Sequence, residues 1–292
     1  MKALYDVPAP AKLNLFLHVI GRRADGMHLL QSAFMLIDWC DRLHFEARAD
    51  GRLSREDLGT ALPADDLVLA AARALQQAGG TGRGVHIRID KRIPTEAGLG
   101  GGSSDAATCL LALNRLWGLN LRLAQLVQLG LQLGADVPFF LHGRNALVEG
   151  IGERATPVAL PAARFAVVKP AAGLSTARIF SDPQLKRDTD PAIISGFAAN
   201  PSGAVDPYRF GVNDLQPVAQ RLCPEVSQAV EWLEAQGLQA RMTGSGSAVF
   251  ARMPGRQALA AAPVGWTVRV CSNMEAHPLA GWAPSDDSSV VG

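Results

Sequence analysis

A run of glycines and serines at residues 94–106, PTEAGLGGGSSDA, constrains the fold of this chain more than any other feature of its sequence. Apolar and polar residues alternate over residues 84–93, which predicts a strand before the run, and apolar residues at helical spacing over residues 104–117 predict a helix after it. Glycines let a backbone approach an anion closely, and the start of a helix adds partial positive charge. The run therefore predicts a polyphosphate site made by Pro94, Gly98, Leu99, Gly100, Gly101, Gly102, Ser103 and Ser104.

Two common phosphate loops do not fit this run. No lysine follows a glycine as a P-loop requires, and Ser103 stands where a dinucleotide fingerprint starting at Gly98 would have its third glycine. The serines can supply hydroxyl groups to a phosphate or to Mg²⁺. A flexible turn without a ligand is the alternative interpretation, but ordering four glycines at a helix start costs conformational entropy unless a ligand uses them.

Strands and helices are interspersed without regular βαβ spacing, which predicts an α+β fold. Strand-like patterns recur at residues 11–20, 29–37, 41–47, 164–169, 238–243 and 247–252. Helical patterns cover residues 65–80, with Asp65 as the expected N-cap, and residues 121–133, 213–222 and 224–236. Gly, Pro and Ala become frequent around residues 150–163, where we place a boundary between lobes at residues 1–155 and 156–276. The aperiodic residues 277–292 are expected to form a flexible tail.

The composition excludes several classes of protein. Twenty-eight basic and 27 acidic residues leave a formal net charge of +1, so no global field would attract nucleic acid or an anionic membrane. No apolar run approaches the roughly 18 residues of a membrane helix. The four cysteines are scattered, which favours neither a zinc site nor a disulfide framework. We therefore expect a cytoplasmic protein with no resident metal site and no nucleic-acid or membrane partner.

Three segments resemble the signature motifs of one kinase superfamily. They are PAPAKLNL at residues 8–15, the glycine run, and RMTGSGSA at residues 241–248, so they extend over nearly the whole chain. They resemble the motifs of the galactokinase, homoserine kinase, mevalonate kinase and phosphomevalonate kinase superfamily. The resemblance implies a two-lobed small-molecule kinase with its active site in the cleft between the lobes. It also implies that the N-terminal lobe binds ATP with Mg²⁺ and that the C-terminal lobe faces the substrate.

The same resemblance implies roles for Lys12 and Asp136. Asp136 would accept the proton of the substrate hydroxyl, and Lys12 would lie beside it, lowering the pKa of that hydroxyl and neutralising the γ-phosphate. Phosphoryl transfer depends mainly on positioning and electrostatic stabilisation, which a carboxylate, an ammonium, Mg²⁺ and backbone N–H groups supply. Without the motifs, Lys12 would be interpreted as a strand lysine reaching for water, and Asp136 as a turn or cap residue.

Further segments are similar to one branch of the superfamily, whose members phosphorylate the 2-hydroxyl of a cytidyl-linked polyol in isoprenoid precursor biosynthesis. They are RADGMH at residues 23–28, GADVPFF at 134–140 and FGVNDL at 210–215. This similarity implies that Asn14, Met27, His28 and Phe180 line the substrate pocket, with Phe180 against the cytosine. The branch usually has tyrosine at the position of Met27, so this chain departs from the pattern there.

Three alternatives remain open on sequence alone. Another kinase of the superfamily would act on homoserine or a mevalonate-type alcohol, and a non-catalytic sensor would bind ATP without transferring phosphate. Both Lys12 and Asp136 are present, which argues against the sensor. A nucleic-acid-binding protein is disfavoured because the chain has no basic stripe. We expect a monomer or a weak homodimer.

Overall fold

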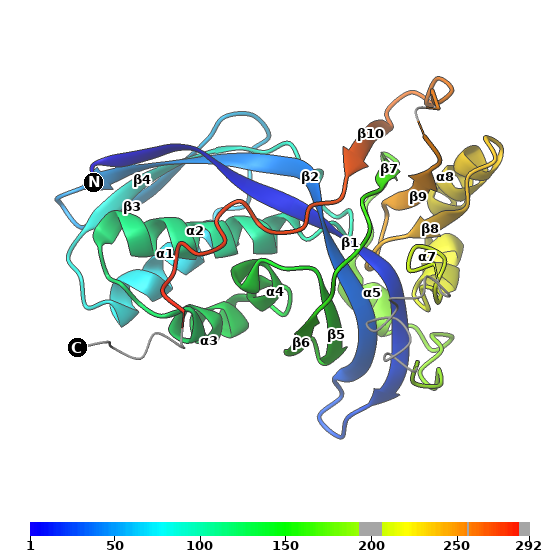
Figure 1. Ribbon diagram of the computed structural model, residues 1–292, viewed down its shortest axis with the longest axis horizontal. Coiled ribbons are helices and arrows are strands. Elements are labelled where there is room, and N and C mark those ends of the chain that lie inside the picture. The colour runs from blue at the N-terminus through cyan, green and yellow to red at the C-terminus, as the bar shows by residue number, and fades with distance from the viewer. Residues whose placement is uncertain (193–205, 256, 286–292) are drawn as a thin grey trace.

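The computed structural model describes residues 1–192, 206–255 and 257–285, which form two lobes (Figure 1). The first lobe is built on a six-stranded sheet in the order β3-β4-β2-β5-β6, with β1 paired to β2. Its strands are β1 (Ala3–Arg22), β2 (His28–Arg48), β3 (Leu53–Asp57), β4 (Gly84–Asp90), β5 (Ala146–Gly150) and β6 (Arg154–Pro157). The pairs are antiparallel except for β3 and β4, which run parallel.

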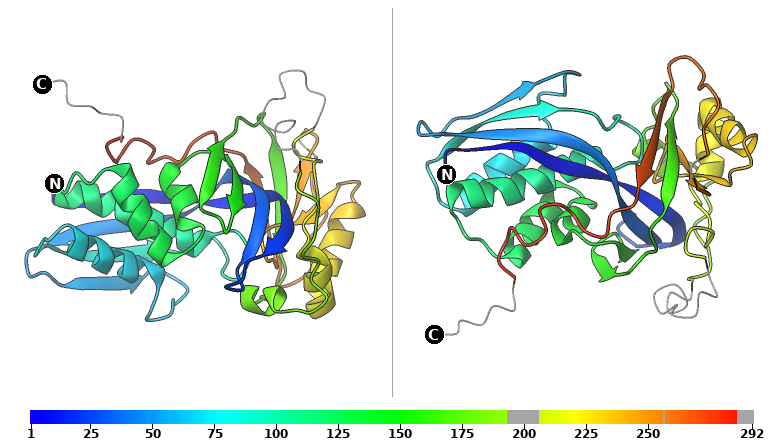
Figure 2. Two further views of the ribbon diagram at one scale, coloured as in Figure 1. Left: turned by 90° about the horizontal axis from the view of Figure 1, so that it is seen from below. Right: turned by 45° about the horizontal axis from the view of Figure 1, so that its top comes forward.

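Four helices cover one face of this sheet (Figure 2). They are α1 (Leu67–Ala78), α2 (Gly101–Trp117), α3 (Leu123–Leu133) and α4 (Val137–His142). Helix α2 is buried along most of its length because alanine, cysteine and leucine occupy nearly every position between Ala106 and Leu113. The N-cap of α1 is Asp66, whose side chain accepts from Leu69 N, and not Asp65 as the sequence predicted.

The second lobe has a four-stranded sheet in the order β10-β7-β9-β8, all antiparallel. Its elements are β7 (Arg164–Lys169), α5 (Thr176–Phe180), α7 (Gln216–Leu222), α8 (Pro224–Glu234), β8 (Ala240–Met242), β9 (Val249–Met253) and β10 (Thr267–Ser272). Apolar residues of α7 and α8, such as Val218, Val226 and Leu233, pack against Met242, Val249 and Ala251 of the sheet. The predicted α+β, two-lobed architecture is confirmed.

The long strands β1 and β2 join the lobes. Figure 1 shows that both run from the first sheet into the second lobe, and register shifts in β1, such as the one between Asn14 and Leu17, bend the pair. A core cluster at the junction contains Leu13 and Phe16 from β1 together with Phe165 and Phe250 from the second sheet. The lobes therefore share apolar core. The boundary expected near residue 155 falls inside β6, which pairs with β5.

The flexible tail predicted for residues 277–292 is wrong for residues 277–285. His277 and Leu279 are buried, His277 N donates to Gly143 O at 2.9 Å, and the Trp282 ring lies under the Arg115 guanidinium at 4.6 Å. The segment has no periodicity because it is an irregular strap that runs from Gly143, after α4, past Arg115 of α2 to the start of α3, where Leu123 N donates to Pro284 O at 3.0 Å. Residues 286–292 lie outside the described part of the chain. Within the described residues, no helix is long and apolar enough to cross a membrane.

Candidate active site

A cleft of about 550 Å³ lies where the two lobes meet. The first lobe contributes walls from β1 and β2, from the glycine loop at residues 94–103, and from residues 62–68 and 135–136. The second lobe contributes Leu174, Thr176, Phe180, Leu215 and residues 244–246. The three motifs that are far apart in the sequence therefore border one cavity.

Lys12 and Asp136 meet in this cleft. Lys12 Nζ is 3.6 Å from Asp136 Oδ2 and donates a hydrogen bond to Asn14 Oδ1. Asp136 precedes α4 with its side chain 31% exposed, whereas the Lys12 side chain on β1 is only 4% exposed. The carboxylate thus faces the cavity while the ammonium supports it from the protein side.

The environment of Lys12 is mostly apolar. Its Nζ lies 4.9 Å from the centre of the Phe34 ring, and its backbone N donates to Leu99 O of the glycine loop at 3.0 Å. Burial lowers the pKa of the Lys12 ammonium, and the nearby Asp136 opposes that shift. The buried Lys12 ammonium is compensated only by the partly exposed Asp136 carboxylate, so it can also attract a second anion at the cleft.

The glycine loop crosses the third motif with backbone against backbone. Gly98 has φ +71°, and a Cβ on it would lie 2.2 Å from Thr243 O, while one on Gly244 would lie 2.8 Å from Gly98 O. Ser247 N donates to Glu96 O at 3.2 Å, which ties the two loops together. Glycine at residues 98 and 244 is therefore required by contact between the lobes, whatever the loops bind.

The remaining loop glycines differ in what surrounds them. Gly100 has φ +71°, and a Cβ there would approach Phe140 at 3.0 Å and Lys12 at 3.1 Å; one on Gly101 would approach Ile93 at 3.1 Å. A Cβ on Gly102 would meet only Leu67, at 3.8 Å. Gly102 is exposed and lines the cleft at the first turn of α2, whose N–H groups make an anion site.

The two serines have different surroundings. Ser103 lines the cleft, whereas Ser104 is fully buried and its Oγ has no hydrogen-bond partner among the described residues. The structure thus places Ser103, and not Ser104, on the cleft wall. Pro94 and Leu99 lie on the cleft wall.

Of the four residues predicted for the substrate, Asn14 and Phe180 line the cleft, whereas Met27 and His28 are not among its lining residues. Asn14 lines the cleft, and its Nδ2 donates to Ser32 Oγ at 2.9 Å. Phe180 also lines it, with its ring centre 4.9 Å from that of His28 and the planes inclined by 39°. Met27 is 48% exposed in the turn between β1 and β2 and is not among the lining residues. The structure thus brings His28, not Met27, against Phe180.

Arg187, which the sequence did not single out, holds this aromatic pair. Its Nε donates to His28 Nε2 at 3.0 Å, and its Nη2 donates to Phe180 O at 3.0 Å. Because Nε2 accepts, the neutral His28 carries its proton on Nδ1. Burial, and then Arg187 and Arg22, lower the pKa of His28. Only the fold could reveal this contact, since no local pattern links Arg187 to His28.

Lys91 also lines the cleft, although no sequence motif pointed to it. Its Nζ pairs with Asp41 and lies 2.8 Å from Asp105 Oδ2, and all three side chains are at most 7% exposed. Asp41 in turn accepts from the backbone N atoms of Arg92 and Ile93. This buried triad fixes the strand end before the glycine loop to the first turn of α2.

Comparison with known proteins decides the family. The chain is 68% identical over 295 residues to the 4-diphosphocytidyl-2-C-methyl-D-erythritol kinase of Variovorax paradoxus strain S110, covering 97% of this chain and 100% of that protein. It is 65% identical to the same kinase of Polaromonas sp. strain JS666, covering 97% and 95%. The chain belongs to the 4-diphosphocytidyl-2-C-methyl-D-erythritol kinase family.

Family models and solved structures agree with this membership. Residues 66–144 match the GHMP kinases N terminal domain and residues 207–264 match the GHMP kinases C terminal model. A crystal structure of 4-(cytidine 5'-diphospho)-2C-methyl-D-erythritol kinase superposes with a TM-score of 0.75 at 34% identity, over 91% of this chain and 98% of that one. Homoserine kinase from Cytophaga hutchinsonii shares the fold, with a TM-score of 0.68 over 95% and 96%. The predicted superfamily and its branch are confirmed, and the chain is an ATP-dependent kinase.

Proposed function

We propose that this chain transfers the γ-phosphoryl group of ATP to the 2-hydroxyl of 4-diphosphocytidyl-2-C-methyl-D-erythritol, a step of isoprenoid precursor biosynthesis. The names of the relatives support the substrate. The observation that carries the chemistry is the 3.6 Å pair of Lys12 and Asp136, which lies in one cleft between the open start of α2 and the Phe180 side chain.

The cleft gives each part of the reactants a place. The phosphates would lie on the first turn of α2, where Gly102 leaves room and Ser103 offers a hydroxyl. The acceptor hydroxyl would lie at Asp136, with the rest of the acceptor toward Phe180. The base of ATP would take the part of the cleft lined by the apolar residues Leu62, Pro63, Leu67 and Val68.

The reaction then needs one proton transfer and one displacement. Asp136 accepts the proton of the 2-hydroxyl while the oxygen of that hydroxyl attacks the γ-phosphorus. The bond between the γ-phosphorus and the bridging oxygen of the β-phosphate breaks, which leaves ADP. Lys12 neutralises charge that develops on the transferred group, and its low exposure keeps that interaction strong.

Mg²⁺ would accompany ATP. Among the residues that the structure describes, no three His, Cys, Asp or Glu side chains form a metal site, so the protein offers no cage of its own. Mg²⁺ commonly binds substrate phosphates with only one or two protein oxygens, and the Ser103 hydroxyl at the start of α2 fits that requirement. When bound, the ion neutralises the β- and γ-phosphate oxygens.

A substrate panel tests the proposal. The protein with ATP and Mg²⁺ is incubated with 4-diphosphocytidyl-2-C-methyl-D-erythritol, homoserine or mevalonate, and products are identified by mass spectrometry. We expect a phosphorylated product and ADP from the cytidyl substrate alone. Turnover of homoserine or mevalonate instead would support the sibling kinases, and ATP binding without turnover of any substrate would support the sensor.

We further propose that the protein works in the cytoplasm as a monomer or weak homodimer. All four cysteines are free thiols, as a reducing compartment permits, and the cleft is formed by residues of one chain. The formal net charge of +1 gives no basis for binding nucleic acid or a membrane. Sedimentation at several protein concentrations tests the oligomeric state.

A further inference from the structure

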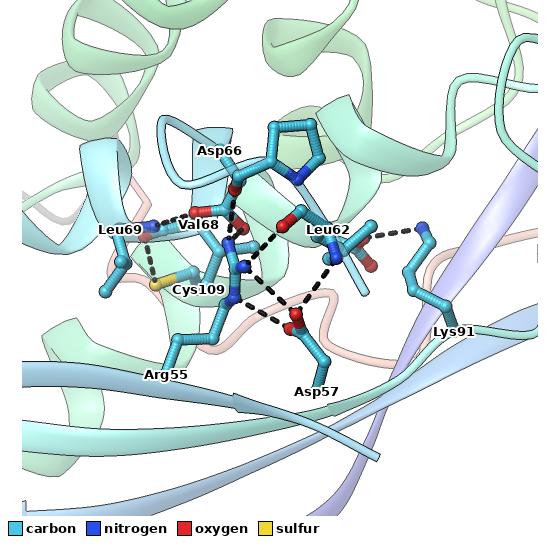
Figure 3. Close-up of polar contacts among 10 residues, drawn as sticks. Arg55, Asp57, Leu62, Asp66, Val68, Leu69, Lys91 and Cys109 are labelled. Carbon is cyan, nitrogen blue, oxygen red and sulfur yellow. Dashed lines mark hydrogen bonds and ion pairs between the residues drawn. The ribbon is translucent and has the colours of Figure 1, made fainter. Parts of the chain in front are cut away.

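The segment between β3 and α1, residues 58–66, is tied into shape by one buried arginine (Figure 3). Arg55 lies near the end of β3 with its side chain 9% exposed. Its Nε is 2.7 Å from Asp57 Oδ1, and its Nη1 is 2.8 Å from Asp66 Oδ2. It therefore forms ion pairs with a carboxylate at each end of the segment.

The same guanidinium also holds the middle of the segment. Nη2 donates to Leu62 O at 3.0 Å and Nη1 donates to Pro63 O at 3.1 Å. Asp57 Oδ2 accepts from Leu62 N at 2.9 Å, so both peptide groups of Leu62 are engaged by the pair. A stretch without regular structure would otherwise lose its order to conformational entropy. The guanidinium group of Arg55 supplies the hydrogen bonds that the backbone of a regular helix or strand would make.

This tied segment forms one end of the cleft. Leu62, Pro63 and Asp66 of the segment line the cavity, and so do Leu67 and Val68 at the start of α1. Leu67 Cδ1, on the residue that follows the segment, lies 3.8 Å from the place a Cβ on Gly102 would take, so the start of α1 lies against the start of α2. Cys109 Sγ on α2 donates to Val68 O at 3.5 Å, which fixes the start of α1 to the same helix (Figure 3).

We propose that Arg55 is a positioning residue that holds residues 58–66 as the wall of the base-binding end of the ATP site, and so sets affinity and selectivity for the nucleotide base. The inference rests on the proposed function, which places the phosphates on α2 and the base beyond them. Leu62 and Pro63 turn their carbonyl groups toward Arg55, which leaves their side chains to form the apolar wall. Arg55 itself touches no reacting atom.

The chemistry of the fork makes the proposal specific to arginine. A lysine offers three donors from one point and cannot serve two carboxylates and two carbonyl groups at once. Without the guanidinium group, no positive charge would offset the carboxylates of Asp57 and Asp66, and residues 58–66 would become less ordered. A ligand that consists only of phosphates does not touch this wall, so its binding reports on α2 alone.

The test compares two ligands on three variants. Arg55→Lys and Arg55→Met remove the fork, and the milder Asp66→Asn removes one ion pair while asparagine still caps α1. Arg48→Lys is the matched control, because Arg48 pairs with Asp50 at the same spacing but is more exposed than Arg55 and does not line the cleft. Calorimetry gives the Kd of ATP and of inorganic tripolyphosphate, each with Mg²⁺, and steady-state kinetics give kcat/KM for ATP and GTP.

For the Arg55 variants we expect the Kd of ATP to rise by at least about tenfold, the effect of losing one charge-assisted hydrogen bond. The Kd of tripolyphosphate and kcat at saturating ATP should stay within about twofold, and the ATP-to-GTP ratio of kcat/KM should fall. Asp66→Asn should also raise the Kd of ATP, but by less. Arg48→Lys should leave both Kd values, kcat and the ATP-to-GTP ratio of kcat/KM unchanged.

Two results would overturn the proposal. One is an equal loss of ATP and tripolyphosphate binding, which would mean that Arg55 only stabilises the lobe. The other is unchanged ATP affinity in Arg55→Lys or, should both Arg55 variants fail to fold, in Asp66→Asn. Failure of the proposed function looks different, because wild-type protein would then give no phosphorylated product in the substrate panel while the ligand comparison could still be made.

Discussion

Lys12 and Asp136 divide the work of the site between a buried cation and a cleft-facing carboxylate. Because the Lys12 side chain is only 4% exposed, water cannot solvate its ammonium group, and the carboxylate beside it is that of Asp136. We expect Asp136→Asn and Lys12→Met each to lower kcat by at least about 10²-fold, the usual size of acid–base and charge-stabilising contributions. ATP binding should survive, because the glycine loop is untouched.

Single-turnover kinetics is the measurement for these two variants, since slow product release could otherwise hide a chemical defect. Ser54→Ala, a change in β3 outside the cleft lining, serves as the control. Full single-turnover activity of either variant would remove that residue from the mechanism.

Gly102 is the loop glycine at which a side chain can probe the phosphate site without disturbing the protein. A Cβ there meets only Leu67 at 3.8 Å, whereas one on Gly101 would press on Ile93 at 3.1 Å. We expect Gly102→Val to raise the Kd of ATP by at least about tenfold, because a branched side chain would occupy the space above the first turn of α2. The melting temperature should not fall, since glycine within a helix costs about 0.5–1 kcal/mol relative to alanine.

Calorimetry and thermal unfolding check this together. Gly82→Val is the matched control, because a Cβ on Gly82 has nothing within 4 Å and the residue is outside the cleft lining. Tight ATP binding by a folded Gly102→Val protein would move the phosphates away from α2.

At the scale of elements, local patterns predicted the parts of the fold that local residues decide. The strand, glycine loop and helix around residues 84–117 are present because alternation, glycine and helical spacing act on neighbouring residues. The break expected between residues 37 and 41 is absent, since β2 continues through it. Asp41, which the sequence placed at the start of a strand, is buried and accepts from Arg92 N and Ile93 N, partners that only the fold supplies.

The same limit applies to the site. Motifs identified Lys12, Asp136 and the glycine loop, because those residue types lie in recognisable runs. Two contacts join segments that share no sequence pattern. They are the hydrogen bond from Arg187 to His28 and the ion pair of Arg55 with Asp66. Side-chain direction was also beyond the sequence: Ser104, Met27 and His28 were assigned to the site, and none of them is among the residues that line the cleft.

The strap at residues 277–285 depends on a histidine that must stay neutral. His277 Nδ1 accepts from Leu279 N at 3.0 Å, and its Nε2 is buried without a partner among the described residues. Burial lowers the pKa of His277 to about 4, from an ordinary value of 6.5. Because the unfolded chain takes up this proton first as the pH falls, acid favours unfolding from pH 6.5 down to about 4.

We therefore expect acidification to weaken the wild-type protein more than a His277→Asn variant, whose amide oxygen can still accept from Leu279 N. Between about pH 7.5 and about pH 5 the additional loss should be about 2 kcal/mol in the free energy of unfolding. Urea titrations at the two pH values measure it, and groups other than His277 contribute alike to both proteins. Equal losses in the two proteins would show that His277 does not titrate in this window.

At the scale of the whole molecule, the two lobes are joined by core rather than by a linker. β1 contributes Leu13 and Phe16 to the junction cluster and Leu17 and Val19 to the core of the second lobe. Two glycine loops, one from each lobe, cross at backbone distance beside it. A cleft built on such a junction keeps Lys12 and Asp136 at a fixed place relative to the second lobe, which is what phosphoryl transfer asks of a protein.

A shared core has a consequence for unfolding. Independent lobes would unfold separately, but here loss of either sheet would expose Phe16, Phe165 and Phe250 together, so neither lobe should persist without the other. We expect one urea transition seen alike by two variants that both lack the junction residue Trp39, one keeping Trp117 of the first lobe without Trp232 and Trp266, the other keeping that second-lobe pair without Trp117 and Trp282. Phe165→Leu at the junction should move both midpoints down by the same amount, because the change removes packing from a core that both lobes use. Two separate midpoints, or a shift confined to the second-lobe probe, would mean that the junction transmits no stability between the lobes.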